Sequence, residues 1–212
     1  DFEKNITLAI IDDAWKTHLR KMDELKQSVQ LAVHEQNSVF GMTNKYLAKS
    51  ADLVMTGFEL NGVYQSVWVG NPVRAQIEAL SKNEAESHSP LRVLILGGSL
   101  GAQSLNQVMP TVLKQGLKDK AIAVRHQCGR DKYEATKQAY GDLYHQVEIK
   151  EFIHNMAAAY EWADVCICRA GALTIAEITM AGLPAVFVPY PSAVDDHQTS
   201  NAMSLVTQGA AL

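Results

Sequence analysis

The sequence predicts an α/β fold with a doubly wound parallel sheet, preceded by a long amphipathic helix. Short apolar runs alternate with stretches of helical spacing, and the loops between them are short. These two observations predict parallel strands joined by right-handed crossover helices. A third observation predicts the leading helix: over residues 1–33, apolar residues recur three or four apart without an intervening glycine or proline.

Composition limits the function classes. With 212 residues, 47% of them apolar, the chain can bury a core as one large or two small domains. The net charge of −4 and the lack of a basic run argue against a nucleic-acid partner. We expect no membrane span and no signal peptide. Cys128, Cys166 and Cys168 lack a metal-ligand spacing, so we expect buried reduced thiols, no metal and a cytosolic location.

The segment after the leading helix is less regular. We expect a loop and a short helix over 40–48, a strand over 52–56, and an extended piece that ends in the glycine-proline turn 70–74. Residues 81–90 are polar and form the best linker candidate. We therefore divide the chain into a leading helix (1–33), an intermediate segment (34–73) and a sheet domain (74–212).

The sheet domain shows a regular alternation. A helix through Leu105, Val108, Met109 and Leu113 follows the first strand, and residues 210–212 look like the start of a further strand. Gly182 and Pro184 are placed to end a helix. Strands are predicted at 91–96, 121–128, 147–152, 165–168 and 185–188, and further helices at 132–140, 156–162, 173–181 and about 201–207.

Ligands of such sheets bind beyond the carboxyl ends of the strands. The loops expected there are 97–102, 152–155, 169–174 and 189–198. Gly97-Gly98-Ser99-Leu100-Gly101 is a candidate phosphate loop, because glycines let backbone N–H groups approach an anion. The sequence is not a dinucleotide fingerprint, because Ser99 and Ala102 replace two required glycines and no acidic residue ends the second strand. A nicotinamide dehydrogenase is therefore disfavoured.

Glu177 lies one turn into the helix that follows the second glycine loop, 169–172. A carboxylate there can accept hydrogen bonds from both ribose hydroxyls while the helix N-terminus holds a diphosphate. Such a set suggests a nucleotide-sugar site. The alternative is a solvated first-turn carboxylate favoured by the helix dipole, and composition leaves the two interpretations about even.

Several other residues are better explained without a ligand. We expect His197 to be a solvated loop residue, and the adjacent Asp195 and Asp196 cannot form a facing acid–base pair. We expect Tyr160 and Trp162 to pack in the core.

Residues 10–30 (IIDDAWKTHLRKMDELKQSVQ) resemble a helix in the helical scaffold of SecA, the bacterial preprotein-translocation ATPase, and the resemblance covers about residues 1–36. No G-x-x-x-x-G-K-[ST] motif occurs in the chain, so ATPase chemistry is not expected. The resemblance implies only a helix that can pack on another helical surface.

Five motifs occur in the order seen in the MurG family of bacterial glycosyltransferases, which the chain resembles over about 31–212. They are HEQN at 34–37, GNPVR at 70–74, GGSLGA at 97–102, CRAGALT at 168–174 and DHQTSNA at 196–202. The family adds N-acetylglucosamine from UDP-N-acetylglucosamine to lipid I and forms lipid II for peptidoglycan. The resemblance implies a GT-B arrangement of two Rossmann-like domains, an inverting reaction without metal or cofactor, and a cytoplasmic location at the inner face of the plasma membrane.

The resemblance also implies roles for single residues. Glu177 would hold the ribose hydroxyls, Ile153 would meet uracil through its backbone, and Gln198 would reach the sugar. The remaining implied contacts are a diphosphate turn of Ala172, Leu173, Thr174, Ile175 and Ala176, a phosphate contact from Ser99, a cleft position for Arg74, and an approach by Asn37 from the other domain.

The chain departs from the family at both ends. Nothing before His34 resembles the family's acceptor domain, where its catalytic histidine is expected, and the end of the donor domain is not matched. We therefore expect UDP-sugar binding with little or no transfer by this chain alone. Residues 33–36 occur in both parent sequences, so recombination, design or faulty sequence assembly could have joined them there, and we favour the last. A binding module without turnover and a helical interaction piece remain the alternatives.

Overall fold

The computed structural model describes residues 32–36, 42–60, 66–80, 88–190 and 197–207. The predicted leading helix and the strand expected at 210–212 lie outside these ranges, apart from residues 32 and 33. Most of the predicted linker, 81–87, lies outside them too.

The first of two parallel sheets has the order β1-β2-β3. It contains β1 (Ala32–Glu35), β2 (Leu53–Thr56) and β3 (Ser66–Trp68), with α4 (Met42–Leu47) and the 3₁₀ turn η1 (Ala48–Ser50) between β1 and β2. The predicted short helix and strand are confirmed. The end of the predicted leading helix is wrong, because Ala32 and Val33 pair with Leu53 and Val54 in the sheet. The helical spacing runs into these residues, but strand pairing decides their conformation.

The second sheet has the order β6-β5-β4-β7-β8, with every neighbouring pair parallel. Its strands are β4 (Leu91–Leu96), β5 (Ile122–Gln127), β6 (Val147–Lys150), β7 (Val165–Cys168) and β8 (Ala185–Phe187). All five predicted strands are confirmed, although β6 ends at Lys150 instead of Phe152. The chain reverses its winding between β4 and β7, which makes this pair the topological switch point.

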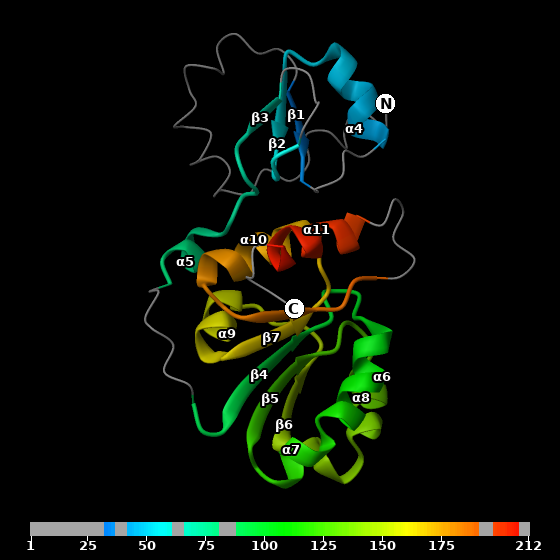
Figure 1. Ribbon diagram of the computed structural model, residues 1–212. Helices are drawn as coiled ribbons and strands as arrows, with labels where there is room; N and C mark the ends of the chain where they lie inside the picture. The colour runs from blue at the N-terminus through cyan, green and yellow to red at the C-terminus, as the bar shows by residue number, and fades with distance from the viewer. Residues whose placement is uncertain (1–31, 37–41, 61–65, 81–87, 191–196, 208–212) are drawn as a thin grey trace.

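Helices cover both faces of the second sheet, as the doubly wound prediction requires (Figure 1). On one face Leu105 and Tyr140 pack against Ile95 and Val124. On the other face Ile77, Tyr160 and Ile178 pack around Leu94. The first face carries α6 (Gln103–Val112), α7 (Lys114–Lys118), α8 (Tyr133–Tyr140) and the 3₁₀ turn η2 (Gly141–Gln146), and the second carries α5 (Ala75–Glu78), α9 (Met156–Trp162) and α10 (Ala172–Ala181).

The last described helix, α11 (His197–Val206), packs on α10, and both lie between the two sheets (Figure 1). It begins four residues before the predicted start at 201. His197 to Ser200 are all polar, which is typical of a loop. A first helical turn also tolerates polar residues, because its N–H groups need hydrogen-bond partners.

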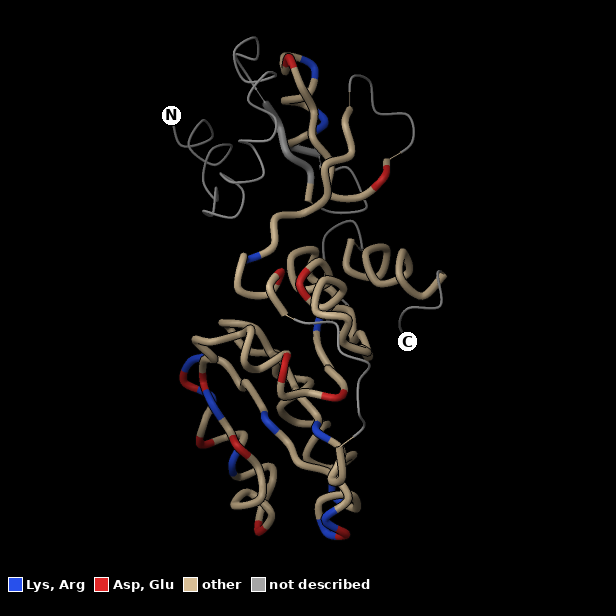
Figure 2. The backbone as a smooth tube through the Cα atoms, turned by 90° about the vertical axis from the view of Figure 1, so that its left-hand side faces the viewer, with Lys and Arg blue, Asp and Glu red and all other residues tan. Residues whose placement is uncertain are grey.

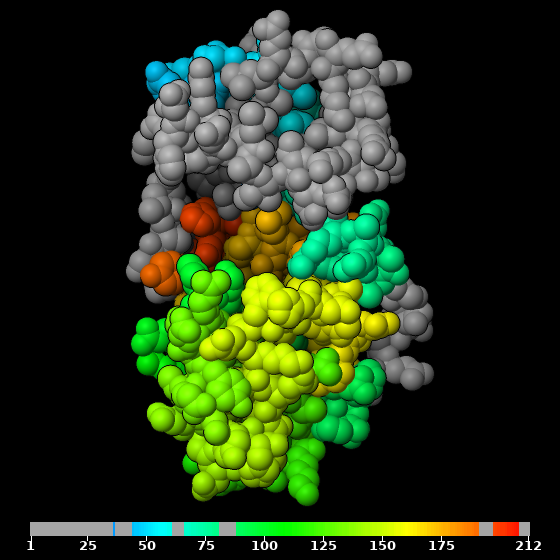
Figure 3. Space-filling view, turned by 180° about the vertical axis from the view of Figure 1, so that it is seen from behind, coloured from blue at the N-terminus to red at the C-terminus, as the bar shows by residue number. Residues whose placement is uncertain are grey.

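The segment that joins the sheets packs on the second one. From behind, α5 (turquoise) lies against α10 (gold) (Figure 3). Ile77 of α5 is 1% exposed and belongs to the core beneath α10. This packing supports the predicted boundary at residue 73, and the division into domains stays a prediction.

The three cysteines are free thiols with buried side chains, as predicted. Among the described residues, no helix is long and apolar enough to cross a membrane.

Candidate functional site

The two glycine loops begin side by side at the switch point. Leu96 and Cys168, the last residues of β4 and β7, are paired in register. The loops 97–102 and 169–171 therefore leave the same edge of the sheet from adjacent strands. This is the edge at which doubly wound sheets bind ligands, as the sequence predicted.

The first loop is packed tightly on the end of β5. Gly101 has φ +72°, and a Cβ there would overlap the carbonyl oxygen of Cys128. The Gly101 carbonyl accepts a hydrogen bond from Lys132 Nζ at 3.0 Å. Gly98 also has a positive φ of +76°, but open space lies around it. Ser99 is exposed on this loop, where its hydroxyl can meet an anion.

The second loop leads directly into α10. Gly171 is the N-cap, and the helix starts at Ala172, one residue before its predicted start. Ala172 and Ile175 are buried, so of the predicted diphosphate turn these two can offer a ligand only their backbone. Leu173, Thr174 and Ala176 are partly exposed. Gly182 ends the helix in the left-handed conformation, as predicted.

Arg169 ties three segments together at this edge. Its Nη1 donates hydrogen bonds to the carbonyl oxygens of Val188 and Pro189, at 2.9 and 2.7 Å. Its Nη2 donates to Ser104 Oγ in the first turn of α6, at 2.7 Å. The guanidinium thus holds the second glycine loop to the end of β8 and to the helix that follows the first loop. This role was not predicted from the sequence, although a cation directly after a buried strand was a visible signal.

Asn201 is a second residue whose role was not predicted from the sequence. Its side chain is fully buried in α11, and its Nδ2 donates a hydrogen bond to the carbonyl oxygen of Ala170 at 3.2 Å. This bond holds the second loop from the helix side. The only signal in the sequence was its place within the last motif, 196–202.

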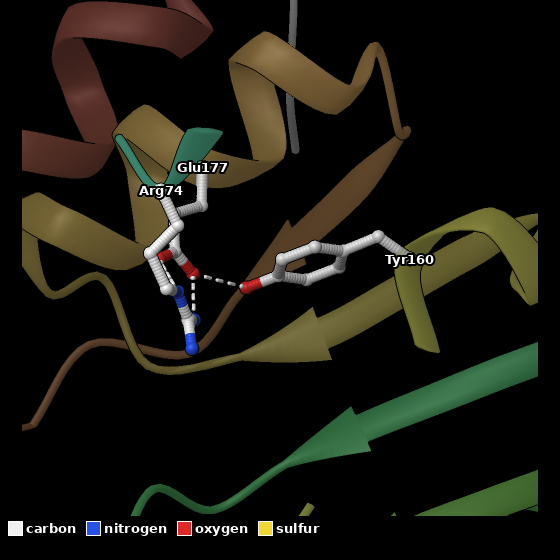
Figure 4. A network of polar contacts seen from close by, with 3 residues as sticks. All are labelled: Arg74, Tyr160 and Glu177. Carbon is white, nitrogen blue, oxygen red and sulfur yellow. Dashed lines mark hydrogen bonds and ion pairs between the residues drawn. The ribbon is translucent and has the colours of Figure 1, made fainter. Parts of the chain in front are cut away.

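Glu177 faces Arg74 and Tyr160 (Figure 4). Arg74 Nε donates to Oε1 and Nη2 donates to Oε2, each at 2.8 Å, and Nη2 is equally close to Oε1. The Tyr160 hydroxyl donates to Oε2 at 3.0 Å. The Glu177 side chain is 13% exposed. It is therefore a partly buried, hydrogen-bonded carboxylate instead of a solvated one.

On α10 and α11, Glu177 is the only Asp, Glu, Lys or Arg residue (Figure 2). Tyr160 is 3% exposed, as expected for a core residue, and its hydroxyl contact to Glu177 was not predicted. Burial, and next the charge of Glu177, raise the pKa of Tyr160 far above its usual value. The phenol therefore stays protonated and donates to the carboxylate.

Arg74 comes from the segment between the sheets. It is the N-cap of α5, four residues after Gly70, which has φ +78°. Asn71 in the same segment donates a hydrogen bond from Nδ2 to the carbonyl oxygen of Gln36, just after β1, at 2.9 Å. The predicted turn 70–74 thus connects the end of β1 with the acidic residue on α10.

The remaining predicted residues lie in the loop after β6, in the first turn of α11 or outside the described residues. Ile153 follows β6, and its side chain packs on the core cluster. Gln198 lies in the first turn of α11, and its Oε1 accepts a hydrogen bond from the Tyr190 N–H at 2.9 Å. The amide nitrogen of Gln198 takes no part in this bond. The expectation that His197 is a solvated loop residue is wrong, because His197 begins α11 and is half-buried. Asn37, Asp195 and Asp196 lie outside the described residues.

Comparison with known proteins follows the same division of the chain. The family model described as glycosyltransferase family 28 C-terminal domain matches residues 92–212. The chain belongs to this family. Residues 1–52 match the SecA wing and scaffold domain. This match confirms the resemblance to the SecA helical scaffold and extends it beyond residue 36.

Two curated relatives of this family 28 chain carry the same description. The UDP-N-acetylglucosamine–N-acetylmuramyl-(pentapeptide) pyrophosphoryl-undecaprenol N-acetylglucosamine transferase of Chromohalobacter salexigens is 51% identical over 187 residues, 86% of this chain and 51% of the relative. The protein of the same description from Alcanivorax borkumensis is 50% identical over 188 residues, 87% of this chain and 52% of the relative. The chain thus spans about half the length of these relatives.

Solved structures agree with the fold. The crystal structure of Acinetobacter baumannii MurG superposes with a TM-score of 0.65 at 36% identity and covers 92% of this chain and 61% of that one. The glycotransferase of kitacinnamycin, at 18% identity and a TM-score of 0.54, supports the fold alone. These neighbours are glycosyltransferases, in line with the α/β fold predicted for a GT-B donor domain.

Proposed function

We propose that this chain binds UDP-N-acetylglucosamine at the edge where β4 and β7 end, and that this is the donor half of a site that transfers N-acetylglucosamine to lipid I and forms lipid II. The observation that carries the proposal is the juxtaposition of two glycine loops with a held carboxylate, Glu177, on the helix that follows the second loop. The relatives, which carry that transferase description, support the choice of sugar nucleotide.

The chemistry follows from the positions of these groups. The N-terminus of α10 presents backbone N–H groups and a positive dipole end, which stabilise the negative charge of a diphosphate. This charge grows when the bond from UDP to the sugar breaks, so the same groups favour the transition state over the ground state. We therefore propose that backbone amides stabilise the charge of the leaving group, that Ser99 donates a hydrogen bond from its hydroxyl, and that no metal ion is needed.

The remaining recognition is proposed for named side chains. Glu177 accepts hydrogen bonds from the ribose hydroxyls, Ile153 meets uracil through its backbone, and the Gln198 amide nitrogen donates to the sugar. Arg74 and Asn37 approach the nucleotide from the first sheet's side of the site. These roles follow the family resemblance. Ile153 lies in the loop after β6, at the same edge of the sheet, and Arg74 contacts Glu177, which supports these two roles.

Transfer also needs groups that activate the acceptor hydroxyl, and the family resemblance implies that these belong to the acceptor domain of the relatives. We propose that the chain alone binds the donor with little or no turnover. In a protein with both halves, the acceptor is a lipid, so the reaction would take place on the inner face of the plasma membrane. For residues 1–31 we propose a separate role, a helix that packs on another helical surface, which the match to the SecA scaffold supports.

Calorimetric titration tests the proposal. We expect UDP and UDP-N-acetylglucosamine to bind, and GDP to bind at least tenfold more weakly because a purine does not fit a site for uracil. Equal affinity for UDP and GDP, or no binding of UDP, would contradict the assignment. A turnover assay with a soluble lipid I analogue tests the second part, and a rate near that of a two-domain enzyme would overturn it.

A further inference from the structure

The carboxylate of Glu177 has too few acceptor sites for all the partners that the proposed function gives it. It offers about four sites for hydrogen bonds. Two are used by Arg74 and one by Tyr160 in the structure. A ribose brings two hydroxyl donors, and about one site is left. One of the present partners must therefore leave when a ribose is bound.

The two partners differ in how easily they can leave. Tyr160 is 3% exposed, sits on α9 and packs in the core, so its hydroxyl would have no water to replace Glu177. The Arg74 side chain is 42% exposed, and water can solvate its guanidinium. Arg74 also lies at the start of the short helix α5, next to the segment between the sheets. Figure 4 shows it reaching Glu177 from this separate segment.

We propose that the ribose hydroxyls displace Arg74 from Glu177, while Tyr160 keeps its hydrogen bond and acts as the positioning residue of the carboxylate. This inference rests on the proposed nucleotide site. It has a structural consequence, because the Arg74–Glu177 ion pair joins the segment between the sheets to α10. Donor binding opens this connection at Arg74, while Ile77 keeps α5 packed in the core beneath α10.

A pair of ligands isolates the contribution of the ribose hydroxyls. UDP and 2′,3′-dideoxy-UDP share the base and the diphosphate, so the ratio of their dissociation constants reports only on the hydroxyls. We measure this ratio by calorimetry on the full 212-residue chain, as wild type, Arg74→Gln and Tyr160→Phe. Lys118→Gln and Tyr144→Phe are matched controls, because both side chains are exposed and lie away from the site.

We expect the preference for UDP over its dideoxy analogue to rise about 3- to 10-fold in Arg74→Gln, because the hydroxyls no longer compete with an ion pair. In Tyr160→Phe the preference falls about 3-fold or more, because the carboxylate loses its fixed orientation. The two control variants keep the wild-type ratio. Thermal unfolding of each variant shows whether it is folded at the temperature of the titration.

Three results would contradict these expectations. An unchanged or lower ratio in Arg74→Gln shows that Arg74 does not compete with the ribose, and an unchanged ratio in Tyr160→Phe removes its positioning role. If the wild type binds both ligands equally, the proposed ribose site itself is wrong. This result distinguishes a failure of the proposed function from a failure of the Arg74 displacement. As a measurement without substitution, the ¹⁵Nε signal of Arg74 is expected to shift with UDP and not with the dideoxy analogue.

Discussion

His126 and Asn106 are hydrogen-bonded inside the core, with Nε2 of the imidazole 3.0 Å from Oδ1 of the amide. Asn106 Nδ2 donates to the carbonyl oxygen of Cys128 at 2.9 Å, so its Oδ1 faces the histidine and can only accept. The pattern assigns the ring hydrogen to Nε2, and Nδ1 accepts from the Tyr140 hydroxyl at 2.9 Å. The chain of bonds fixes the Cys128 carbonyl on which Gly101 of the first glycine loop packs.

This histidine makes stability depend on pH. Burial lowers the pKa of His126 from 6.5 to about 4. Between these pH values the unfolded chain binds a proton at His126 that the folded chain does not bind. The free energy of unfolding is therefore highest above about pH 6.5 and falls as the pH drops towards 4. The loss amounts to about 3 kcal/mol.

Urea denaturation at several pH values between 4 and 7 measures this loss. In His126→Gln, which has no titrating group at this position, we expect the stability to fall less steeply over the same range, whatever its value at pH 7. Parallel curves for the two proteins would show that His126 does not cause the pH dependence.

The two glycines with positive φ in the first loop provide a matched pair of substitutions. Gly98→Ala meets open space and costs about 1 kcal/mol for the left-handed backbone alone. Gly101→Ala has the same backbone strain and also overlaps the Cys128 carbonyl, so we expect a loss of about 2–4 kcal/mol and a weaker affinity for UDP. Denaturation and UDP titration of both variants measure the difference, and equal effects would contradict the close packing of this loop.

Arg169 is expected to need its shape as well as its charge. Arg169→Ala loses three hydrogen bonds, and we expect the free energy of unfolding to fall by about 1–3 kcal/mol. Arg169→Lys keeps the charge, but one ammonium group cannot replace a planar fork that contacts Ser104 and two carbonyl groups, so it is expected to lose most of the same stability. Lys118→Ala on the exposed turn of α7 is the control. Full stability in Arg169→Lys would show that charge alone is sufficient.

The sequence predicted those features that depend on local pattern. β4 and β7 were predicted at their observed bounds because a parallel strand covered on both faces is a nearly continuous apolar run, which Arg92 alone interrupts in β4. The C-cap at Gly182 followed from its own residue type. The contact between Arg74 and Glu177 joins residues 103 positions apart, and no local pattern reports it. The sequence could therefore predict that Glu177 contacts a ligand, but it could not predict that Arg74 is hydrogen-bonded to its carboxylate.

The start of α11 and the role of Tyr160 were missed for related reasons. The polar residues at the start of α11 resemble loop, and only packing on α10 shows that they are helical. Tyr160 has the apolar body of a core residue, and the target of its hydroxyl depends on the placement of α9 against α10. Both features arise from tertiary packing and not from spacing along the chain.

Titration of UDP against wild type and Glu177→Ala tests the central claim, that the carboxylate on α10 recognises the ribose, most directly. Glu134→Ala, an exposed acidic residue in the first turn of α8, is the control for the loss of a negative charge. We predict that Glu177→Ala weakens UDP binding by about ten- to hundred-fold, or about 1.5–3 kcal/mol, and that Glu134→Ala leaves it unchanged. A folded Glu177→Ala protein that binds UDP as tightly as the wild type would contradict the account.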